Sequence, residues 1–422
     1  MSCPPKTSFR PGIIGEQERA EAIEMTSALE SYRVLDLADE KGAQCVKTLA
    51  ELGADVVKVE PPEGNSMRFS PPFARDIPHP EGSLWFAYYN TDKRSITLNL
   101  DTEEGRDIFK RLVVRFDVVV ESFSPGRLSN LGLGYDSLRH VNPSVILTSI
   151  TGFGQDGPFS AYKAPDLVCF AMGGPMYPSG ERGQAPCVAP GNLAYGVAGA
   201  WAAAGTIIAL YHRATTGAGQ HIDVSGQEAA AMITDSAITR YSYEGSIIPR
   251  EGNTYPWITP GDLYPCRDGW VRIVAGQAVH WRRLVAWMNA PEPLGDPGWE
   301  NREKRNQNKT LVDGIVSDFT RKFTRAELFA EGQKLGVPIT PVNTPGEFMR
   351  SEVAKARNFF TEIDHPVLGR HPYAGPPYKF SEVPSRNKRP APLLGQHNEE
   401  IYCGDLGFTR EDLCELRARR VI

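Results

Sequence analysis

The sequence lacks the short motifs that mark many metal and hydrolase sites. Its eight histidines include no HxH or HExxH spacing, and its seven cysteines are scattered without a CxxC pair. We therefore expect no metal site, and the odd number of isolated cysteines is typical of reduced thiols in a cytosolic protein. No GxSxG turn occurs either, so nothing supports a hydrolase with a serine nucleophile.

Long basic runs and export signals are missing as well. The 422 residues carry a formal net charge of −5 with no extended Lys/Arg block, so we expect no nucleic-acid partner. The first 25 residues hold no continuous apolar core of the kind a signal peptide needs, which favours a cytoplasmic location. One segment, 193–211, is apolar enough to raise the question of a membrane span. It is rich in alanine and glycine and lies mid-chain between segments of soluble character, so we predict a buried helix and no membrane contact.

The sequence does contain an alternation of short apolar runs with amphipathic stretches. Apolar runs occur at 33–37, 54–60 and 144–150, and helical spacing follows the first of them at 42–53. Strands separated by helices of 10–15 residues predict a parallel sheet with helices on both faces. The predicted fold class is therefore α/β, with a Rossmann-like layer near the start of the chain.

The second half of the chain has a different pattern. A hairpin turn is predicted at Asp268-Gly269 and amphipathic helices follow it. We interpret 250–340 as a smaller α+β domain and 1–30 as a loose N-terminal extension.

The segment GFGQDG, 152–157, matches GxGxxG after a predicted strand. A dinucleotide site requires the third glycine to open a helix whose N–H groups face the pyrophosphate. Pro158 and Pro165 follow here and no periodic helix begins, so a tight loop is favoured over a nicotinamide site.

Asn192 ends the turn APGN, directly before the long apolar segment. Asparagine is among the best residues for capping the first turn of a helix, so the local prediction for Asn192 is a helix cap. A helix N-terminus also carries a positive potential that stabilises a carboxylate or an oxyanion. The position therefore suits a negatively charged reactive group, although the amide of Asn192 has no anionic oxygen.

Eight segments follow one another from Arg33 onward: RVLDLAD, LAELGADVVKVEPPEGNSMR, NTDKRSITLNLDTEEGRDIFKRLV, DVVVESFSPGRLSNLGLGYDSL, NPSVILTSITGFGQDGPFS, GTIIALYHRATTGAGQHIDVS, LGVPITPV and PAPLLGQHNEEIY. Together they resemble the class III CoA-transferases, which include formyl-CoA transferase and the carnitine-type and benzylsuccinate CoA-transferases, with alpha-methylacyl-CoA racemases as relatives. The resemblance implies a large Rossmann-like domain built from both chain ends, 31–245 and 341–422, with the small domain between them in the sequence. A second implication is an interlocked dimer, in which each subunit passes through the other. It also implies CoA thioesters as substrates, with no cofactor bound permanently.

The resemblance further implies contacts to CoA. The matching positions are Leu98, Asn130, Leu131 and Lys163. The ammonium group of Lys163 is a good partner for a CoA phosphate. Asn130 stands where some members carry an arginine, so one phosphate contact is expected to be weaker or replaced.

Substrate contacts are implied at Glu40 and at Trp85. Glu40 falls in a loop where the transferases place a polar active-site residue. An aromatic group either lines a pocket for an aryl acid or belongs to the core; its members are Trp85, Phe86, Tyr88, Tyr89 and Trp257. The subfamily likeness suggests an aryl-substituted dicarboxylate such as benzylsuccinate as the acid.

Asn192 matches the aspartate that the family's transferases use as nucleophile. That carboxylate attacks the acyl-CoA to give a mixed anhydride and then a thioester, before CoA passes to the acceptor acid. A carboxamide cannot form this anhydride. The racemases pair the same aspartate with a histidine, and that position here is Pro165. Asp166, which follows it, either belongs to the active site or is a loop acid that orders the turn.

Three interpretations remain open for the missing nucleophile. We favour a non-nucleophilic subunit of a heteromeric CoA-transferase whose homologous partner keeps the aspartate, because DLADEKG and RDIPHPEGSLWF look most like the two-subunit benzylsuccinate group. The second interpretation is a homomeric transferase that uses Asp166 or Glu40. The third is a non-catalytic protein that binds a CoA thioester.

Overall fold

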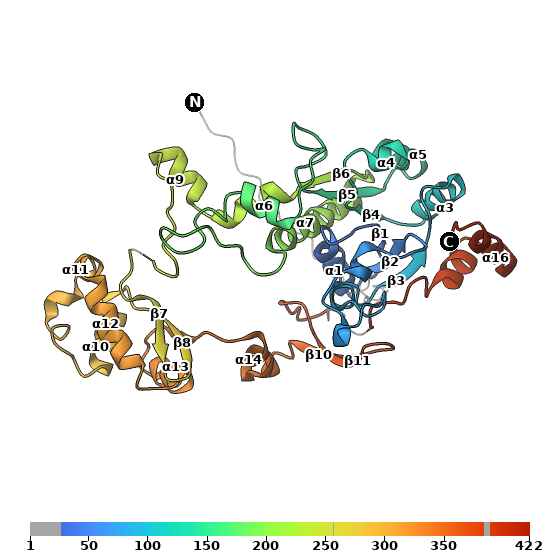
Figure 1. Cartoon of the computed structure of the whole chain (residues 1–422). Coiled ribbons are helices and arrows are strands. Elements are labelled where there is room, and N and C mark those ends of the chain that lie inside the picture. The colour runs from blue at the N-terminus through green and yellow to red at the C-terminus, as the bar shows by residue number, and fades with distance from the viewer. Residues whose placement is uncertain (1–26, 256, 384–388) are drawn as a thin grey trace, which may run out of the picture.

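The computed structural model describes residues 27–255, 257–383 and 389–422, so nearly all of the predicted extension at 1–30 lies outside the described residues. The largest sheet has six parallel strands in the order β3-β2-β1-β4-β5-β6 (Figure 1). These strands are β1 (Arg33–Asp36), β2 (Asp55–Glu60), β3 (Arg94–Thr97), β4 (Val118–Glu121), β5 (Ile146–Thr151) and β6 (His221–Ser225). The predicted α/β class is confirmed, and the strand order reverses between β1 and β4, where such sheets bind ligands.

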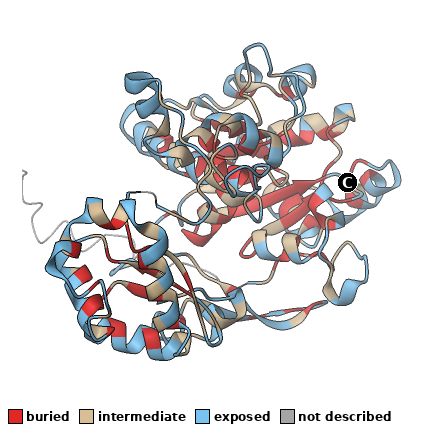
Figure 2. Ribbon diagram, turned by 60° about the vertical axis from the view of Figure 1, so that its left-hand side comes forward, coloured by how far each residue is buried: buried red, intermediate tan, exposed pale blue. Residues whose placement is uncertain are grey.

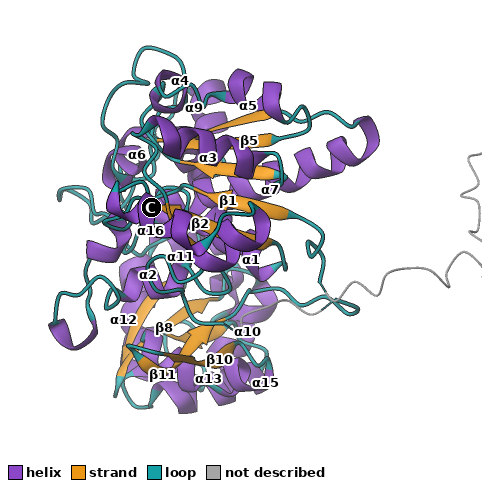
Figure 3. Ribbon diagram, turned by 90° about the vertical axis from the view of Figure 1, so that its right-hand side faces the viewer, coloured by secondary structure: helices purple, strands orange, loops and turns teal. Residues whose placement is uncertain are grey.

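Helices cover both faces of this sheet, as the alternation predicted (Figure 3). The helices that bury it are α1 (Ala43–Glu51), α3 (Glu103–Val113), α5 (Tyr135–Val141), α7 (Leu193–Thr216) and α16 (Arg410–Ala418). Leu35 and Val57 pack with residues of α3, α5 and α16. Val34 and Val56 point to the opposite face and pack with α1 and α7, because successive side chains alternate along a strand. Both faces of the strands are therefore buried, as Figure 2 shows.

A separate three-stranded antiparallel sheet lies in the second half of the chain. Its strands are β7 (Gly261–Cys266), β8 (Gly269–Val274) and β9 (Ile339–Pro341). Cys266 pairs with Gly269, so the predicted hairpin is present, with Arg267 and Asp268 as its turn residues, one position earlier than the predicted pair. The helices that pack on this sheet include α10 (Ala278–Trp287), α12 (Lys309–Thr320) and α13 (Arg325–Lys334).

The remaining elements connect these two bodies or cover their edges. They are η2 (Ser66–Phe69), η3 (Ala74–Asp76), α2 (Leu84–Tyr89), α4 (Arg127–Asn130), α6 (Asp166–Met172), α8 (Gly226–Ala231), η4 (Met232–Thr234), α9 (Ala237–Glu244), η5 (Pro297–Glu300), α11 (Arg302–Gln307), α14 (Pro345–Arg350), α15 (Glu352–Ala356), the hairpin of β10 (Phe360–His365) and β11 (Gly369–Ala374), and the π-helical turn η6 (Glu400–Asp405).

The C-terminal segment returns to the edge strand β3. Asn398 Oδ1 accepts a hydrogen bond from the Thr97 amide at 2.9 Å, and the Tyr402 hydroxyl donates to the Thr97 carbonyl at 2.6 Å. The Asn99 amide donates to the Val421 carbonyl at 2.8 Å. Residues from both ends of the chain therefore share one core. The domain limits themselves, 31–245 with 341–422 around 250–340, remain a prediction.

Helix α7 is, within the described residues, the one helix long and apolar enough to cross a membrane, and half of its most apolar window is buried. The buried side packs on α1 and on the sheet. Trp201, Ile208 and Tyr211 are exposed on the other side. Exposed apolar side chains gathered on one side of a helix are typical of a face that another surface covers.

Candidate active site at the switch point of the sheet

A cavity of 340 Å³ lies beyond the carboxyl ends of β1, β4 and β5, at the point where the strand order reverses. The loops after these strands, the loop before α6 and the first turn of α7 line it. The lining residues are Glu40, Lys41, Phe123, Ser124, Pro125, Thr151, Gly152, Ser160, Ala161, Tyr162, Lys163, Ala164, Pro165 and Tyr195. Both positively and negatively charged side chains therefore reach one cavity.

Two of the predicted contact residues, Glu40 and Lys163, line this cavity. Three others lie elsewhere. Leu98 is buried in the core beside the end of β3, Leu131 packs against the same core, and Asn130 is exposed at the end of α4. Their roles toward CoA remain predictions.

The cap at the start of α7 differs from the local prediction. Asn192 precedes the helix, but its side chain makes no capping hydrogen bond. Asp166 Oδ1 instead accepts a hydrogen bond from the Tyr195 amide at 2.9 Å. Asn192 is therefore the N-cap residue by position, as predicted, but the prediction that its side chain caps the helix is wrong. A carboxylate competes well for these amides because a charged acceptor is favoured at the positive end of a helix.

Asp166 thus connects two helices at the cavity edge. It is the first residue of α6 and is 9% exposed. Burial raises its pKa, while hydrogen bonds from the Tyr195 and Ala194 amides act in the opposite direction. The Tyr195 hydroxyl donates to the Ala164 carbonyl at 2.7 Å and ties the same turn to the loop. Asp166 orders this turn, one of the two roles considered for it.

We expect Asp166→Ala to lower the free energy of unfolding by about 1–2 kcal/mol, because the α7 amides lose their acceptor. The measurement is urea unfolding at constant pH. Asn192→Ala is the matched control and is expected to change stability by less than about 0.5 kcal/mol. An equal loss in both variants would mean that Asn192 caps the helix after all.

The cysteines near the site are poor nucleophiles. Burial, with the nearby charge of Asp166, raises the pKa of the Cys169 thiol to about 11. Burial, with the nearby charge of Asp36, raises the pKa of Cys45 to about 12. Both thiols stay protonated near neutral pH, and the thiolate is the reactive form.

Glu121, the last residue of β4, is a buried carboxyl group that the sequence analysis missed. It is 4% exposed and accepts a hydrogen bond from the Phe123 amide at 2.7 Å. Burial raises its pKa to about 7, against hydrogen bonds from Ser149 and Phe123. The available signal was an acid closing an apolar strand at the carboxyl edge of a parallel sheet.

Glu121 is expected to make stability depend on pH between about 4.5 and 7. The folded protein holds this proton up to about pH 7, whereas the unfolded chain loses it near 4.5, so the free energy of unfolding falls as pH rises through this window. The loss is on the order of 3 kcal/mol. Urea unfolding at pH 5 and pH 8 measures it. Glu121→Gln should flatten the profile, while the exposed control Glu415→Gln should leave it unchanged; a wild-type slope in Glu121→Gln contradicts the assignment.

The described residues contain no group of three or more His, Cys, Asp or Glu side chains placed to hold a metal ion.

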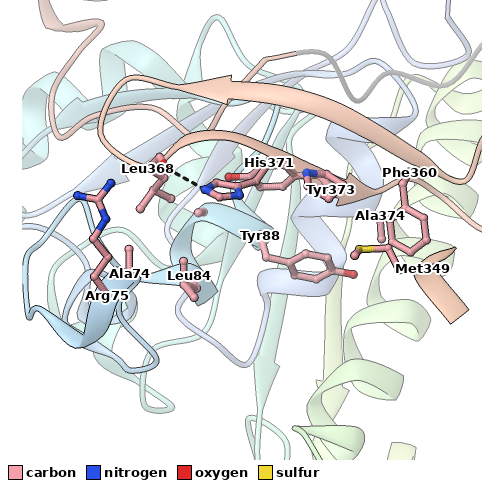
Figure 4. A pocket seen from close by; sticks show the side chains of 12 residues that line it. Ala74, Arg75, Leu84, Tyr88, Met349, Phe360, Leu368, His371, Tyr373 and Ala374 are labelled. Carbon is pink, nitrogen blue, oxygen red and sulfur yellow. Dashed lines mark hydrogen bonds between the residues drawn. The ribbon is translucent and has the colours of Figure 1, made fainter. Parts of the chain in front are cut away.

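A second, apolar cavity of 760 Å³ lies between α2 and the β10–β11 hairpin (Figure 4). Tyr88 lines it, whereas Trp85 and Tyr89 are not part of its lining. Trp85 lies edge-on to Tyr89, with 6.4 Å between ring centroids, and Phe86 is buried. The four α2 members of the predicted aromatic group therefore do not share one lining. The fifth, Trp257, lies outside α2, beside Tyr255 in the segment before β7. Trp85 as a substrate contact remains a prediction.

Comparisons with known proteins agree with one another. The sequence profile described as "CoA-transferase family III" matches residues 29–398. The chain is 36% identical to "Succinyl-CoA:(R)-benzylsuccinate CoA-transferase subunit BbsE" of Thauera aromatica, over 92% of this chain and 97% of that protein. It is 34% identical to "Formyl-CoA:oxalate CoA-transferase" of Streptomyces avermitilis, over 94% of this chain and 100% of that protein. The crystal structure of "a CAIB/BAIF family protein from Brucella suis" superposes with a TM-score of 0.81 at 32% identity, covering 90% of this chain and all of that chain.

Proposed function

The chain belongs to CoA-transferase family III, and we propose that it is the non-nucleophilic subunit of a heteromeric CoA-transferase. Members of this family take CoA thioesters as substrates and need no permanently bound cofactor. The proposed complex moves CoA from an acyl-CoA such as succinyl-CoA to a carboxylic acid. The name of the Thauera aromatica relative, a subunit acting on benzylsuccinate, supports a second subunit and an aryl dicarboxylate as the acid.

The observation that carries this proposal is the amide at the start of α7. Covalent transfer requires an anionic oxygen that attacks the thioester carbonyl while the CoA thiolate leaves. Asn192 has no such oxygen. Asp166 is a poor substitute, because its Oδ1 already accepts a hydrogen bond from the Tyr195 amide. Neither Asp166 nor Asn192 is among the residues that line the cavity, which includes Tyr195 from the first turn of α7.

The charged lining of the cavity supports CoA binding. Lys163 makes neither a hydrogen bond nor an ion pair with any described residue. An ammonium group at the mouth of a cavity suits a CoA phosphate. We assign the remaining CoA contacts to Leu98, Asn130 and Leu131, with Asn130 supplying no charge.

An interlocked dimer with a homologous subunit is part of this proposal. Exposed apolar side chains on two helices support it: Trp201, Ile208 and Tyr211 on α7, and Ile238 and Tyr241 on α9. Apolar surface of this kind is typical of a face covered by another chain. In this arrangement 31–245 and 341–422 form the large domain of each subunit and 250–340 the small one.

A homomeric transferase is the second candidate, and one observation favours Glu40 as its nucleophile. The Glu40 side chain lines the cavity and makes no hydrogen bond or ion pair with any described residue. The Glu40 carboxylate is therefore free to contact a ligand, whereas one oxygen of Asp166 is occupied by the Tyr195 amide. A non-catalytic protein that binds a CoA thioester is the third candidate.

Co-expression with a family paralogue that carries the aspartate separates these candidates. The heteromer predicts a stable complex that exchanges CoA between succinyl-CoA and an acid, with activity lost when the partner's aspartate is changed to asparagine. Exchange by this chain alone would overturn the subunit role and favour Glu40. Thioester binding without exchange by the chain or by any complex would leave the non-catalytic role.

A further inference from the structure

Lys41 is a second cation of the same cavity, and neither the family resemblance nor the proposed function gives it a role. It lies in the loop between β1 and α1 and lines the cavity with Glu40 and Lys163. Its side chain is 20% exposed. The lining therefore carries two ammonium groups and one carboxylate.

The ammonium group of Lys41 is held from behind by Asp39. Asp39 Oδ2 pairs with the Lys41 ammonium, while Oδ1 accepts hydrogen bonds from the Ser122 hydroxyl at 2.6 Å and from the Lys41 amide at 3.0 Å. Asp39 itself does not line the cavity. Its carboxylate therefore acts as a brace that fixes the position of Lys41.

The Lys41 ammonium keeps unused donors. A lysine ammonium has three N–H groups, and in the described part of the chain Asp39 is the only group that forms a hydrogen bond or ion pair with it. The charge of Lys41 also acts on the pKa of Glu121, without a hydrogen bond or ion pair between the two side chains. Helix α1 begins two residues later with no side-chain cap at Gly42, so its first amides add positive potential on the same side. A ligand carboxylate can occupy the remaining donors as a charge-assisted partner.

The position within the cavity determines which part of a ligand meets Lys41. Tyr195, in the first turn of α7 after Asn192, lines the cavity together with Lys41. An acyl group that reaches the start of α7 therefore shares the cavity with Lys41. Lys163, on the loop before α6, remains for the CoA part of the molecule.

We propose that Lys41, braced by Asp39 and Ser122, binds the free carboxylate of a dicarboxylic acyl group and makes the site selective for acyl-CoA thioesters that carry a second, distal carboxylate. This inference rests on the proposed binding of a CoA thioester. It adds the residue that distinguishes a succinyl group from an uncharged acyl group of the same length.

The test is calorimetric titration of the chain, alone and in complex with its paralogue, with succinyl-CoA, butyryl-CoA and free CoA. The wild-type protein is expected to bind succinyl-CoA about tenfold more tightly than butyryl-CoA, as one charge-assisted contact implies. Lys41→Gln should bring the two affinities together by weakening succinyl-CoA alone. Lys41→Arg, which keeps the charge, should retain most of the preference.

Lys163→Gln is the matched control from the same cavity. It is expected to weaken all three ligands by a similar factor and to leave the ratio of succinyl-CoA to butyryl-CoA unchanged. Equal binding of the two thioesters by the wild type, or an unchanged ratio in Lys41→Gln with a native circular dichroism spectrum, overturns the role of Lys41 and leaves the proposed function intact. Failure of the wild type and of the complex to bind any thioester overturns the proposed function, and the inference falls with it.

Discussion

Asn192→Asp is expected to give the isolated chain a covalent intermediate that the wild type does not form. The substitution places a carboxylate at the start of α7, where the helix end stabilises negative charge. The Asn192 side chain makes no capping hydrogen bond, so the new carboxylate displaces no interaction in the first turn. Because loss of a covalent nucleophile costs on the order of 10⁶-fold in kcat in a well-studied protease, even an imperfectly placed carboxylate should raise CoA exchange by about 10³-fold.

Intact-mass analysis measures this gain. After incubation with succinyl-CoA, hydroxylamine should convert the activated carboxyl group to a hydroxamate and borohydride should reduce the thioester, each changing the mass at residue 192. Asn192→Ala is the matched control and should remain unmodified. If Asn192→Asp binds succinyl-CoA but forms no adduct, residue 192 is not the position of the nucleophile. A wild-type adduct on Glu40 would instead support the homomeric candidate.

The central sheet was predictable because its signal is local. Strands β1, β2, β4 and β5 contain short apolar runs, whereas β3 (RSIT) and β6 (HIDVS) do not. Each connection is long enough for a helix, so the order of elements favours a parallel sheet. The hairpin near Asp268-Gly269 was predictable in place but not in register. The turn residues are Arg267 and Asp268, and Gly269 is the first residue of β8. The family resemblance, confirmed by the profile over 29–398, extended these local predictions to most of the chain.

The helix cap at α7 was not predictable from local sequence. Propensity correctly identified a helix start after Asn192, but the acceptor comes from Asp166, 26 residues earlier in the chain, which bonds to Tyr195. Capping preferences describe which residue competes best within one turn. They contain no information about a carboxylate that another helix brings to the same amides.

The charge arrangement of the cavity also depended on tertiary structure. Glu40 and Lys163 were identified by resemblance. Lys41 carried no distinguishing sequence signal, and the signal at Glu121, an acid that closes an apolar strand, did not show that its carboxyl group is buried. The role of Lys41 depends on its pairing with Asp39 and on its place in the cavity lining. The role of Glu121 depends on its burial, and none of these features can be predicted from the local sequence. In the folded chain Lys41 and Lys163 place two ammonium groups beside the Glu40 carboxylate in the lining of one cavity.

Arg68→Met is expected to lower the free energy of unfolding by about 3–5 kcal/mol, because it leaves a buried carboxylate without its partner. The Arg68 side chain is fully buried, and its Nε and Nη2 donate to the two oxygens of Glu60 at 2.6 and 2.8 Å. Burial alone would raise the pKa of Glu60, but the hydrogen bonds and charge of Arg68 lower it overall. Nη2 also donates to the Pro392 carbonyl at 3.1 Å and so ties the returning C-terminal segment to η2.

Urea unfolding of a variant series separates the buried charge from the lost packing. Arg68 also pairs with Glu81 through Nη1. Arg68→Met combined with Glu60→Gln and Glu81→Gln should recover part of the stability, since neither acid that pairs with Arg68 then carries an unpaired charge. Arg410→Met, which breaks the exposed pair with Glu399, is the matched surface control and should cost less than about 1 kcal/mol. If Arg68→Met costs no more than this control, the pair does not stabilise the fold. If the triple variant is no more stable than Arg68→Met, the loss comes from packing against Phe86, whose ring centroid lies 3.8 Å from the Arg68 guanidinium carbon, rather than from unpaired carboxylates.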